Sequence, residues 1–227
     1  FEIQDEGSQL MSLFALDAQA GLGALQAEPG PVHTSRQTVV SLPDHPWSSF
    51  RVVDACAGAG GKSLAMADIM GGQGRVFSYD ISDRKIQALK RRARHANLNN
   101  IQGVPVPEGQ ELEFLSKFKK SADRVLVDAP CSGWGVLRRN PDIKWRQSSE
   151  TMERFPSIQL RLLKAYASLV KSGGQLTFGT CTFRKEETLA VVEAFTQELG
   201  DEFKAIGGGY FGPGASDGFY MHAWTRA

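Results

Sequence analysis

Residues 50–80 read FRVVDACAGAGGKSLAMADIMGGQGRVFSYD, and this stretch decides the fold. An apolar run at residues 50–54 is followed by a glycine-rich turn, a helical pattern over residues 61–70 and a second apolar run at residues 75–80. Two buried strands joined by a helix form a βαβ unit, in which the strands run parallel. The stretch therefore predicts an α/β protein built on a parallel sheet.

The same alternation continues through the rest of the chain. Further strands are predicted at residues 101–106, 123–128, 175–180 and 218–224, and helices at residues 8–26, 82–97, 110–118, 157–171 and 184–199. Residues 27–49 are predicted to be an irregular connection with a short strand at 37–42, and residues 134–150 a long basic loop. This order indicates a doubly wound sheet covered on both faces. We expect residues 1–49, a helix and the irregular connection, to pack on a domain formed by residues 50–227.

The composition limits what the chain can be. Its 227 residues suffice for one large domain with a buried core, and 41% hydrophobic and 22% charged residues are ordinary for a globular protein. Three cysteines without CxxC spacing argue against a disulfide scaffold and a zinc site, and favour a cytoplasmic setting. No apolar run reaches the ~20 residues of a membrane span, and no signal peptide is visible. Because the chain begins with Phe1, we expect a piece of a longer protein.

The turn after the first strand has the chemistry of a cofactor site. Gly58, Gly60 and Gly61 permit a tight turn close to a ligand, and the following helix presents its amino terminus to polar or anionic groups. Asp80 ends the next strand about 20 residues after Gly60, the usual distance of a ribose-binding acid. These features predict a nucleoside cofactor, and the alternative is a tight turn with a capping Asp. An ATPase phosphate loop is disfavoured, because Cys56 stands where that loop needs glycine.

Two of the three cysteines lie where open α/β sheets bind ligands. Cys131, in the run DAPCSG, and Cys181, in the run GTCT, each follow a predicted strand, so both thiols are expected at the carboxyl edge of the sheet. A thiolate there is a candidate nucleophile, and Asp128 places a carboxylate beside Cys131. The alternative for each cysteine is a small buried hydrophobe. The four histidines form no ligand-like cluster, so no metal site is predicted.

A basic segment follows Cys131 directly. It holds Trp134 and Trp145 together with four cations, Arg138, Arg139, Lys144 and Arg146. Cations interleaved with aromatic rings favour contact with the phosphates and bases of a nucleic acid, and the alternative is a solvated loop. A second basic run, over residues 84–94, is expected to be a solvated helix face. The net charge of +1 favours neither alternative.

With these motifs placed, the chain resembles the Sun-type (Fmu-like) RNA cytosine-carbon-5 methyltransferases over nearly its whole length. The matching motifs are QDEGSQ at 4–9, DACAGAGGK at 54–62, Asp80, DAPCSG at 128–133, RRNPDIKWR at 138–146, TCT at 180–182 and SDGF at 216–219. The resemblance implies a Rossmann-like class I methyltransferase sheet, mostly parallel with an antiparallel last strand. Two departures are AGAGG at 57–61, where many members have AAPGG, and Glu108, where the third strand usually leads to an Asp.

The resemblance also implies a cofactor, a reaction and site residues. S-adenosyl-L-methionine is expected to bind Cys56, Ala57, Gly58, Ala59, Gly60, Gly61, Lys62, Asp80 and Asp128. Cys181 is expected to attack carbon-6 of cytosine, Cys131 to assist adduct breakdown and Asp128 to hydrogen-bond the base; Lys62 is expected to help lower a thiol pKa. The cations Arg138, Arg139, Lys144 and Arg146 are expected to contact an rRNA or tRNA with an unstacked cytosine. The implied enzyme is a cytoplasmic monomer with no metal and no membrane contact.

Two other interpretations remain open at the level of the residues. The roles of the two cysteines are exchangeable, and a DNA cytosine-carbon-5 methyltransferase would use Cys131 as the nucleophile, although the chain has little room for a separate DNA-recognition domain. A non-catalytic RNA-binding or ribosome-assembly factor on the same scaffold would keep RNA binding without cofactor binding. The missing third-strand Asp keeps this second interpretation open.

Overall fold

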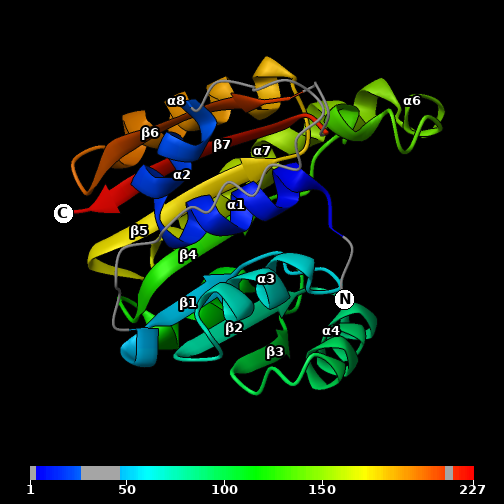
Figure 1. Cartoon of the computed structure of the whole chain (residues 1–227). Helices are drawn as coiled ribbons and strands as arrows, with labels where there is room; N and C mark the ends of the chain where they lie inside the picture. Colours follow the sequence, from blue (N-terminus) through cyan, green and yellow to red (C-terminus); the bar gives the residue numbers. More distant parts are fainter. Residues whose placement is uncertain (1–3, 27–46, 213–216) are drawn as a thin grey trace.

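The computed structural model describes residues 4–26, 47–212 and 217–227. The strands are β1 (Arg51–Asp54), β2 (Arg75–Asp80), β3 (Ile101–Pro105), β4 (Ala122–Asp128), β5 (Val170–Thr180), β6 (Phe203–Phe211) and β7 (Phe219–Arg226). They form one sheet in the order β3-β2-β1-β4-β5-β7-β6 (Figure 1). Strands β1 to β5 pair in parallel, and β7 runs antiparallel to both β5 and β6. The predicted α/β fold is confirmed.

Helices cover both faces of this sheet. The α-helices are α1 (Glu6–Leu16), α2 (Ala18–Gln26), α3 (Gly61–Ile69), α4 (Asp83–His95), α5 (Glu111–Leu115), α6 (Ile143–Arg146), α7 (Ser149–Ala167) and α8 (Leu189–Leu199), and the 3-10 turns are η1 (Trp47–Ser49), η2 (Ser116–Phe118), η3 (Trp134–Val136) and η4 (Lys185–Glu187). On one face lie α1 and α3 (Figure 1). These two helices bury Met11 and Met66 in one core. On the other face, α7 and α8 bury Leu163 and Phe195 in a second core.

The helix predicted over residues 8–26 is two helices, because the chain breaks at Asp17. Asp17 is extended (φ −149°, ψ 103°), and its carboxylate accepts a hydrogen bond from Ala20 N at 3.0 Å, which caps α2. The side chain of Gln175 satisfies backbone groups on both sides of the break: it donates to Phe14 O at 2.8 Å and accepts from Ala18 N at 3.0 Å. A side chain of β5 thus anchors both helices to the sheet.

The boundary between α7 and β5 differs from the prediction. Helix α7 begins at Ser149 instead of residue 157, contains Pro156, and ends at Ala167 instead of residue 171. Strand β5 then begins at Val170 instead of residue 175, with Gly173 at φ +71° in an irregular part of its pairing with β4. The glycines that suggested a helix end therefore form an irregularity inside the strand.

The sequence analysis missed β6, so the antiparallel part of the sheet has two strands instead of one. The glycines at residues 207–209 lower the strand propensity of this segment, which is why no strand was predicted there. In the structure Gly208 is needed for the pairing, because a Cβ at this position would lie 2.1 Å from Met221 O of β7. Residues 134–150, predicted as a loop, contain η3, α6 and the start of α7. The strand predicted at 37–42 lies outside the described residues, and the division at residue 49 stays a prediction.

Candidate active site

Cys131 and Cys181 meet at the carboxyl edge of the sheet. Cys131 follows β4 and Cys181 follows β5, and the parallel pairing of these strands sets Asp128 opposite Gly179. The two Sγ atoms lie 3.3 Å apart, and both thiols are free and half-buried. The structure therefore brings the two predicted thiols into direct contact.

The surroundings of the two thiols separate their pKa values. The hydrogen bond with Cys131 is the largest influence on Cys181 and lowers its pKa, burial and the Asp128 charge oppose this, and the Lys62 ammonium adds to the lowering. The same hydrogen bond, together with burial, raises the pKa of Cys131 well above its ordinary value. Burial likewise raises the pKa of Cys56. The contact between the thiols and the Lys62 charge therefore favour a thiolate at Cys181 over a thiolate at Cys131.

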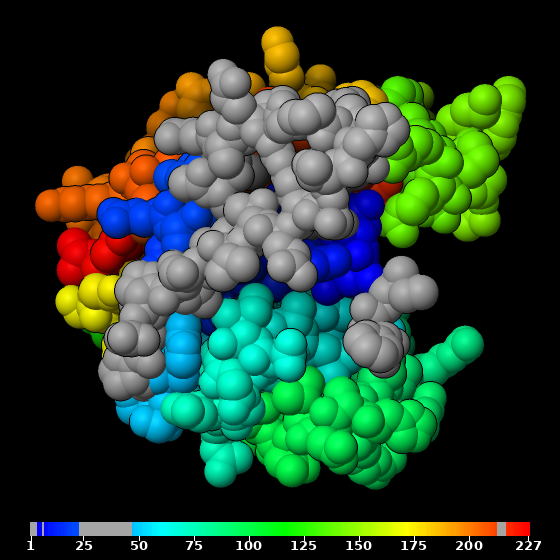
Figure 2. Space-filling view, in the orientation of Figure 1, coloured from blue at the N-terminus to red at the C-terminus, as the bar shows by residue number. Residues whose placement is uncertain are grey.

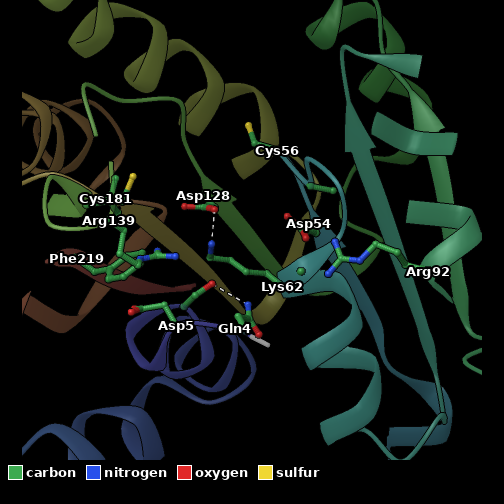
Figure 3. Close-up of a pocket in the computed structure, with 14 residues that line it drawn as sticks. Gln4, Asp5, Asp54, Cys56, Lys62, Arg92, Asp128, Arg139, Cys181 and Phe219 are labelled. Carbon is green, nitrogen blue, oxygen red and sulfur yellow. Dashed lines mark hydrogen bonds and ion pairs between the residues drawn. The ribbon is translucent and has the colours of Figure 1, made fainter. Parts of the chain in front are cut away.

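Lys62 and Asp128 form an ion pair in the middle of the site. Lys62, in the first turn of α3, places Nζ 2.6 Å from Oδ2 of Asp128, the last residue of β4 (Figure 3). Burial lowers the pKa of Lys62, but the charge of Asp128 and the hydrogen bond to it outweigh burial and raise this pKa. The charge of Lys62 is therefore favoured, and it acts on the Cys181 thiol by lowering its pKa.

Two cavities open at this edge and share a wall. The polar cavity, of about 350 Å³, is lined by residues that include Gln4, Asp5, Ser8, Asp54, Lys62, Arg92, Arg139 and Phe219 (Figure 3). The apolar cavity, of about 340 Å³, is lined by residues that include Gly58, Asp80, Ile81, Val106, Pro130, Ile158 and Leu162. Cys56, Asp128 and Cys181 line both cavities. Ligands in the two cavities would therefore meet at these three side chains.

Three acidic residues line the apolar cavity: Asp80 at the end of β2, Glu108 after β3 and Glu111 at the start of α5. Asp80 is buried, and its Oδ2 accepts a hydrogen bond from Gly58 N at 2.9 Å. Glu108 is exposed after β3, whereas Glu111 is buried and accepts a hydrogen bond from Arg161 at 2.8 Å. Each carboxylate oxygen carries a second lone pair, so Asp80 holds the glycine turn and still has capacity to accept from a ligand hydroxyl.

The glycine-rich turn borders both cavities. Gly60 has φ +91° at the start of α3, and a Cβ there would lie 2.6 Å from Leu89. Arg92 donates from α4 to Ala59 O at 2.6 Å. Of the predicted cofactor residues, Gly58 and Asp80 line the apolar cavity only, and Cys56 and Asp128 line both cavities. Ala57, Gly61 and Lys62 line the polar cavity only. Ala59 and Gly60 shape the turn without lining either one.

Asp54 is a buried carboxyl at the inner end of the polar cavity. Its Oδ2 accepts a hydrogen bond from Ser63 at 2.6 Å, while its Oδ1 has no partner among the described residues. Burial raises the pKa of Asp54 to about 6, against the opposing effect of the Ser63 hydrogen bond. The Asp54 carboxyl therefore loses its proton near pH 6.

The basic segment after Cys131 divides into two parts. Arg139 points back into the polar cavity, where its Nε donates to the buried Asp217 at 2.7 Å. Arg138, Lys144 and Arg146 are exposed, and the α6 segment projects from the body of the protein (Figures 1 and 2). On α6 the Lys144 ammonium lies 5.0 Å from the centre of the ring of Trp145, which is 81% exposed.

The sequence analysis assigned no site role to the amino-terminal motif. Gln4, Asp5 and Ser8 line the polar cavity, and Gln4 Nε2 donates to Ser8 Oγ at 2.7 Å (Figure 3). The available signal was the i, i+4 spacing of Gln4 and Ser8, which puts both side chains on one side of a helix start. Arg92 and Phe219 are further lining residues that no sequence pattern singled out.

Residues 4–26, 47–212 and 217–227 contain no group of three or more His, Cys, Asp or Glu side chains suited to hold a metal ion. None of the helices in these ranges is both long and apolar enough to cross a bilayer.

The sequence matches a family of RNA-modifying enzymes. The family model described as 16S rRNA methyltransferase RsmB/F matches residues 43–205. The probable ribosomal RNA small subunit methyltransferase B of Bacillus subtilis (strain 168) is 40% identical over 156 residues, covering 69% of this chain and 34% of that protein. The corresponding protein of Synechocystis sp. is 37% identical, with 69% and 35% covered. The chain thus spans about a third of the length of these curated relatives.

Solved structures share the fold. PH0851 superposes with a TM-score of 0.75 at 24% identity, covering 99% of this chain and 47% of that one. NSun6 from Pyrococcus horikoshii with SFG superposes with a TM-score of 0.73 at 19% identity, covering 98% and 52%. At these identities the likeness supports the fold alone.

Proposed function

The chain belongs to the 16S rRNA methyltransferase RsmB/F family, and from this premise we propose that it methylates carbon-5 of a cytosine in rRNA through a covalent cysteine adduct. S-adenosylmethionine is the methyl donor of this family. The observation that carries the finer proposal is the 3.3 Å contact between Cys131 and Cys181 at the wall that both cavities share.

The apolar cavity fits the cofactor. Its volume of about 340 Å³ is bordered by the backbone of Gly58, by the buried carboxylate of Asp80 and by apolar side chains that suit an adenosyl group. We assign Asp80 to the ribose and Glu108, after β3, to the adenine amine in place of the usual Asp. When bound, S-adenosylmethionine supplies an electrophilic methyl group. The shared wall of Cys56, Asp128 and Cys181 would then face that group.

The polar cavity fits an unstacked cytosine. Carbon-5 of cytosine is a poor nucleophile, and addition of a thiolate to carbon-6 makes it enamine-like and reactive. Cys181 forms the carbon–sulfur bond, because its pKa is lowered and it lines both cavities. Asp128 hydrogen-bonds the base near nitrogen-3 and the exocyclic amine, and the Lys62 cation beside it stabilises negative charge that develops on the ring.

Release of the product reverses the addition. The carbon-5 proton leaves to solvent, its electron pair restores the carbon-5–carbon-6 double bond, and the carbon–sulfur bond breaks with its pair returning to Cys181. The protonated thiol of Cys131 donates a hydrogen bond to the departing sulfur and stabilises it. Cys181 lines the polar cavity and Cys131 does not, which favours this division of roles over a DNA-type mechanism with Cys131 as nucleophile.

The RNA would reach the site along the basic segment. Arg138, Lys144 and Arg146 are exposed on or next to the projecting α6, where they suit phosphate contacts. Arg139, held by Asp217 at the polar cavity, suits a phosphate close to the target nucleotide.

The test is a denaturing gel of unmodified 16S rRNA with methyl-labelled S-adenosylmethionine. Cys181→Ala should lose methyl transfer by about 1,000-fold or more. Cys131→Ala should accumulate a labelled protein–RNA adduct that wild type does not accumulate. An adduct only in Cys181→Ala would exchange the two roles. RNA binding without label in any sample would favour the non-catalytic RNA-binding factor.

A further inference from the structure

Two buried polar side chains form hydrogen bonds with the loop of Cys131, one on each side of the cysteine. Gln159 of α7 donates from Nε2 to Pro130 O at 2.9 Å, and Glu187 of η4 accepts from Ser132 N through Oε2 at 2.7 Å. Both side chains are 0% exposed. The residues directly before and after Cys131 are thus each fixed by a buried side chain from another element.

Gln159 and Glu187 also form a hydrogen bond with each other. Gln159 Nε2 lies 3.3 Å from Glu187 Oε2, so the amide nitrogen of Gln159 faces two acceptors and the amide orientation is determined. Glu187 Oε1 accepts from Arg184 at 3.2 Å, which supplies the opposite charge. A buried carboxylate is costly unless it is paired and hydrogen-bonded, and here each oxygen of Glu187 has a partner.

The same network reaches the loop of the second thiol. Glu187 and Arg184 follow Cys181 closely in the chain, and Thr182 Oγ1 lies 2.9 Å from Ser132 Oγ. The loops of Cys131 and Cys181 come from different strands, so no covalent constraint sets the distance between their sulfur atoms. These side-chain bonds add to the backbone bonds between the loops, from Gly135 N to Cys181 O and from Ala129 N to Gly179 O, each 2.9 Å long.

We propose that Gln159 and Glu187 are positioning residues that hold the loop of Cys131 so that its thiol stays within hydrogen-bond distance of Cys181. Neither side chain lines the polar or the apolar cavity, so they act through the thiols and not by contact with the RNA base or the cofactor. Their effect on adduct release rests on the covalent reaction proposed above. Their effect on the free thiols does not.

The first measurement needs neither RNA nor cofactor. In the full chain, the rate of Cys181 alkylation by iodoacetamide is followed against pH by peptide mass spectrometry. Cys131→Ala, Gln159→Met and Glu187→Met should each move the midpoint of this profile upward by about one pH unit, because the thiolate loses its hydrogen bond. Glu187→Gln keeps an acceptor for Ser132 N, and Glu186→Gln alters an exposed neighbour, so both should stay near wild type.

The second measurement is the adduct assay. At a pH above the shifted midpoints, where Cys181 is a thiolate in every variant, Gln159→Met and Glu187→Met should keep single-turnover methyl transfer within about threefold. They should nevertheless raise the trapped adduct about tenfold, toward the level of Cys131→Ala. Adding Gln159→Met to Cys131→Ala should trap no more adduct than Cys131→Ala alone. If Gln159 and Glu187 served only to stabilise the core, their Met variants would melt at a lower temperature but would not accumulate more adduct.

Wild-type midpoints in folded Gln159→Met and Glu187→Met would overturn the positioning role, whatever the adduct does. If Glu187→Met fails to fold, Gln159→Met decides the question alone, because its replacement is uncharged. Absence of adduct in Cys131→Ala would instead overturn the proposed covalent function, and the alkylation midpoints would still decide whether these residues position the thiol.

Discussion

The Nζ atom of Lys62 lies 2.6 Å from Oδ2 of Asp128, and this ion pair joins the first turn of α3 to the end of β4. One residue comes from the glycine-rich turn and the other from the loop motif of Cys131. The pair therefore connects the proposed cofactor turn with the proposed catalytic loop, and it lies beside Cys181 in the polar cavity.

Removal of the cation should impair chemistry more than binding. Lys62→Met leaves the Asp128 carboxylate without its partner and withdraws a cation that lowers the pKa of Cys181. We expect kcat for methyl transfer to fall about 100-fold, with a smaller change in KM for S-adenosylmethionine. Lys164→Met is the control, because Lys164 pairs with Glu198 between α7 and α8, outside the two cavities. Equal losses in both variants would contradict the role of Lys62.

The ribose assignment predicts a specific loss of cofactor affinity. Asp80→Ala removes an acceptor from Gly58 N and a carboxylate from the apolar cavity. Calorimetry should show binding of S-adenosylmethionine weakened by about 10- to 100-fold. Asp83→Ala, in the first turn of α4, tests whether any nearby negative charge suffices and should bind as wild type does. Unchanged affinity in Asp80→Ala would remove Asp80 from the cofactor site.

The assignment of Glu108 is tested separately. Glu108→Gln keeps the size of the side chain but replaces one acceptor oxygen by a donor, which disfavours contact with the adenine amine. We expect affinity for S-adenosylmethionine to fall about fivefold or more. Glu113→Gln on α5 is the control, since Glu113 is not a lining residue of the apolar cavity. If Glu108→Gln binds S-adenosylmethionine as tightly as wild type does, Glu108 does not contact the adenine amine, and Glu111 is the other acid that lines this part of the apolar cavity.

The two parts of the basic segment should respond differently to substitution. Charge reversal of Arg138 and Lys144 should weaken RNA binding and reduce its dependence on log salt concentration by about one unit per lost phosphate contact. Arg139→Ala should in addition lower the melting temperature, because it leaves the buried Asp217 without the guanidinium. If the charge-reversal variants bind RNA as wild type does at every salt concentration, α6 is a solvated surface without RNA contacts.

Asp54 predicts a pH dependence of stability. Its pKa is raised from 3.8 to about 6, so the folded protein binds this proton more tightly than the unfolded chain does. The associated stability is present below about pH 4 and is lost as pH rises through about 6, on the order of 3 kcal/mol in total. Asp54→Asn should therefore gain stability relative to wild type between pH 4 and pH 7 in urea titrations. Asp68→Asn, exposed on the same α3, should show no such gain.

Features that depend on local pattern could be predicted from the sequence. The βαβ unit of residues 50–80 follows from its apolar runs and glycines. The meeting of Cys131 and Cys181 follows because each comes directly after a strand and parallel strands end at one edge. What the sequence could not supply is the 3.3 Å contact between the thiols, which depends on strand register and on Gln159 and Glu187.

The features that were missed depend on partners far away in the chain. The break at Asp17 requires Gln175 to satisfy the backbone that it exposes. Strand β6 carries glycine because Met221 of β7 approaches Gly208 too closely for a side chain. Gln4 and Ser8 reach the polar cavity only because α1 packs against α3. No local window of sequence contains both members of these pairs.

The wall of Cys56, Asp128 and Cys181 between the two cavities limits how the proposed activity could be redesigned. Under the proposed assignment, a substitution in that wall would alter the fit of the methyl donor and of the nucleotide at once, so selectivity for one could not be tuned there without disturbing the other. Gln4, Ser8 and Val136 line the polar cavity but not the apolar one. They are the positions from which a library could retarget the enzyme to another base and keep its natural methyl donor.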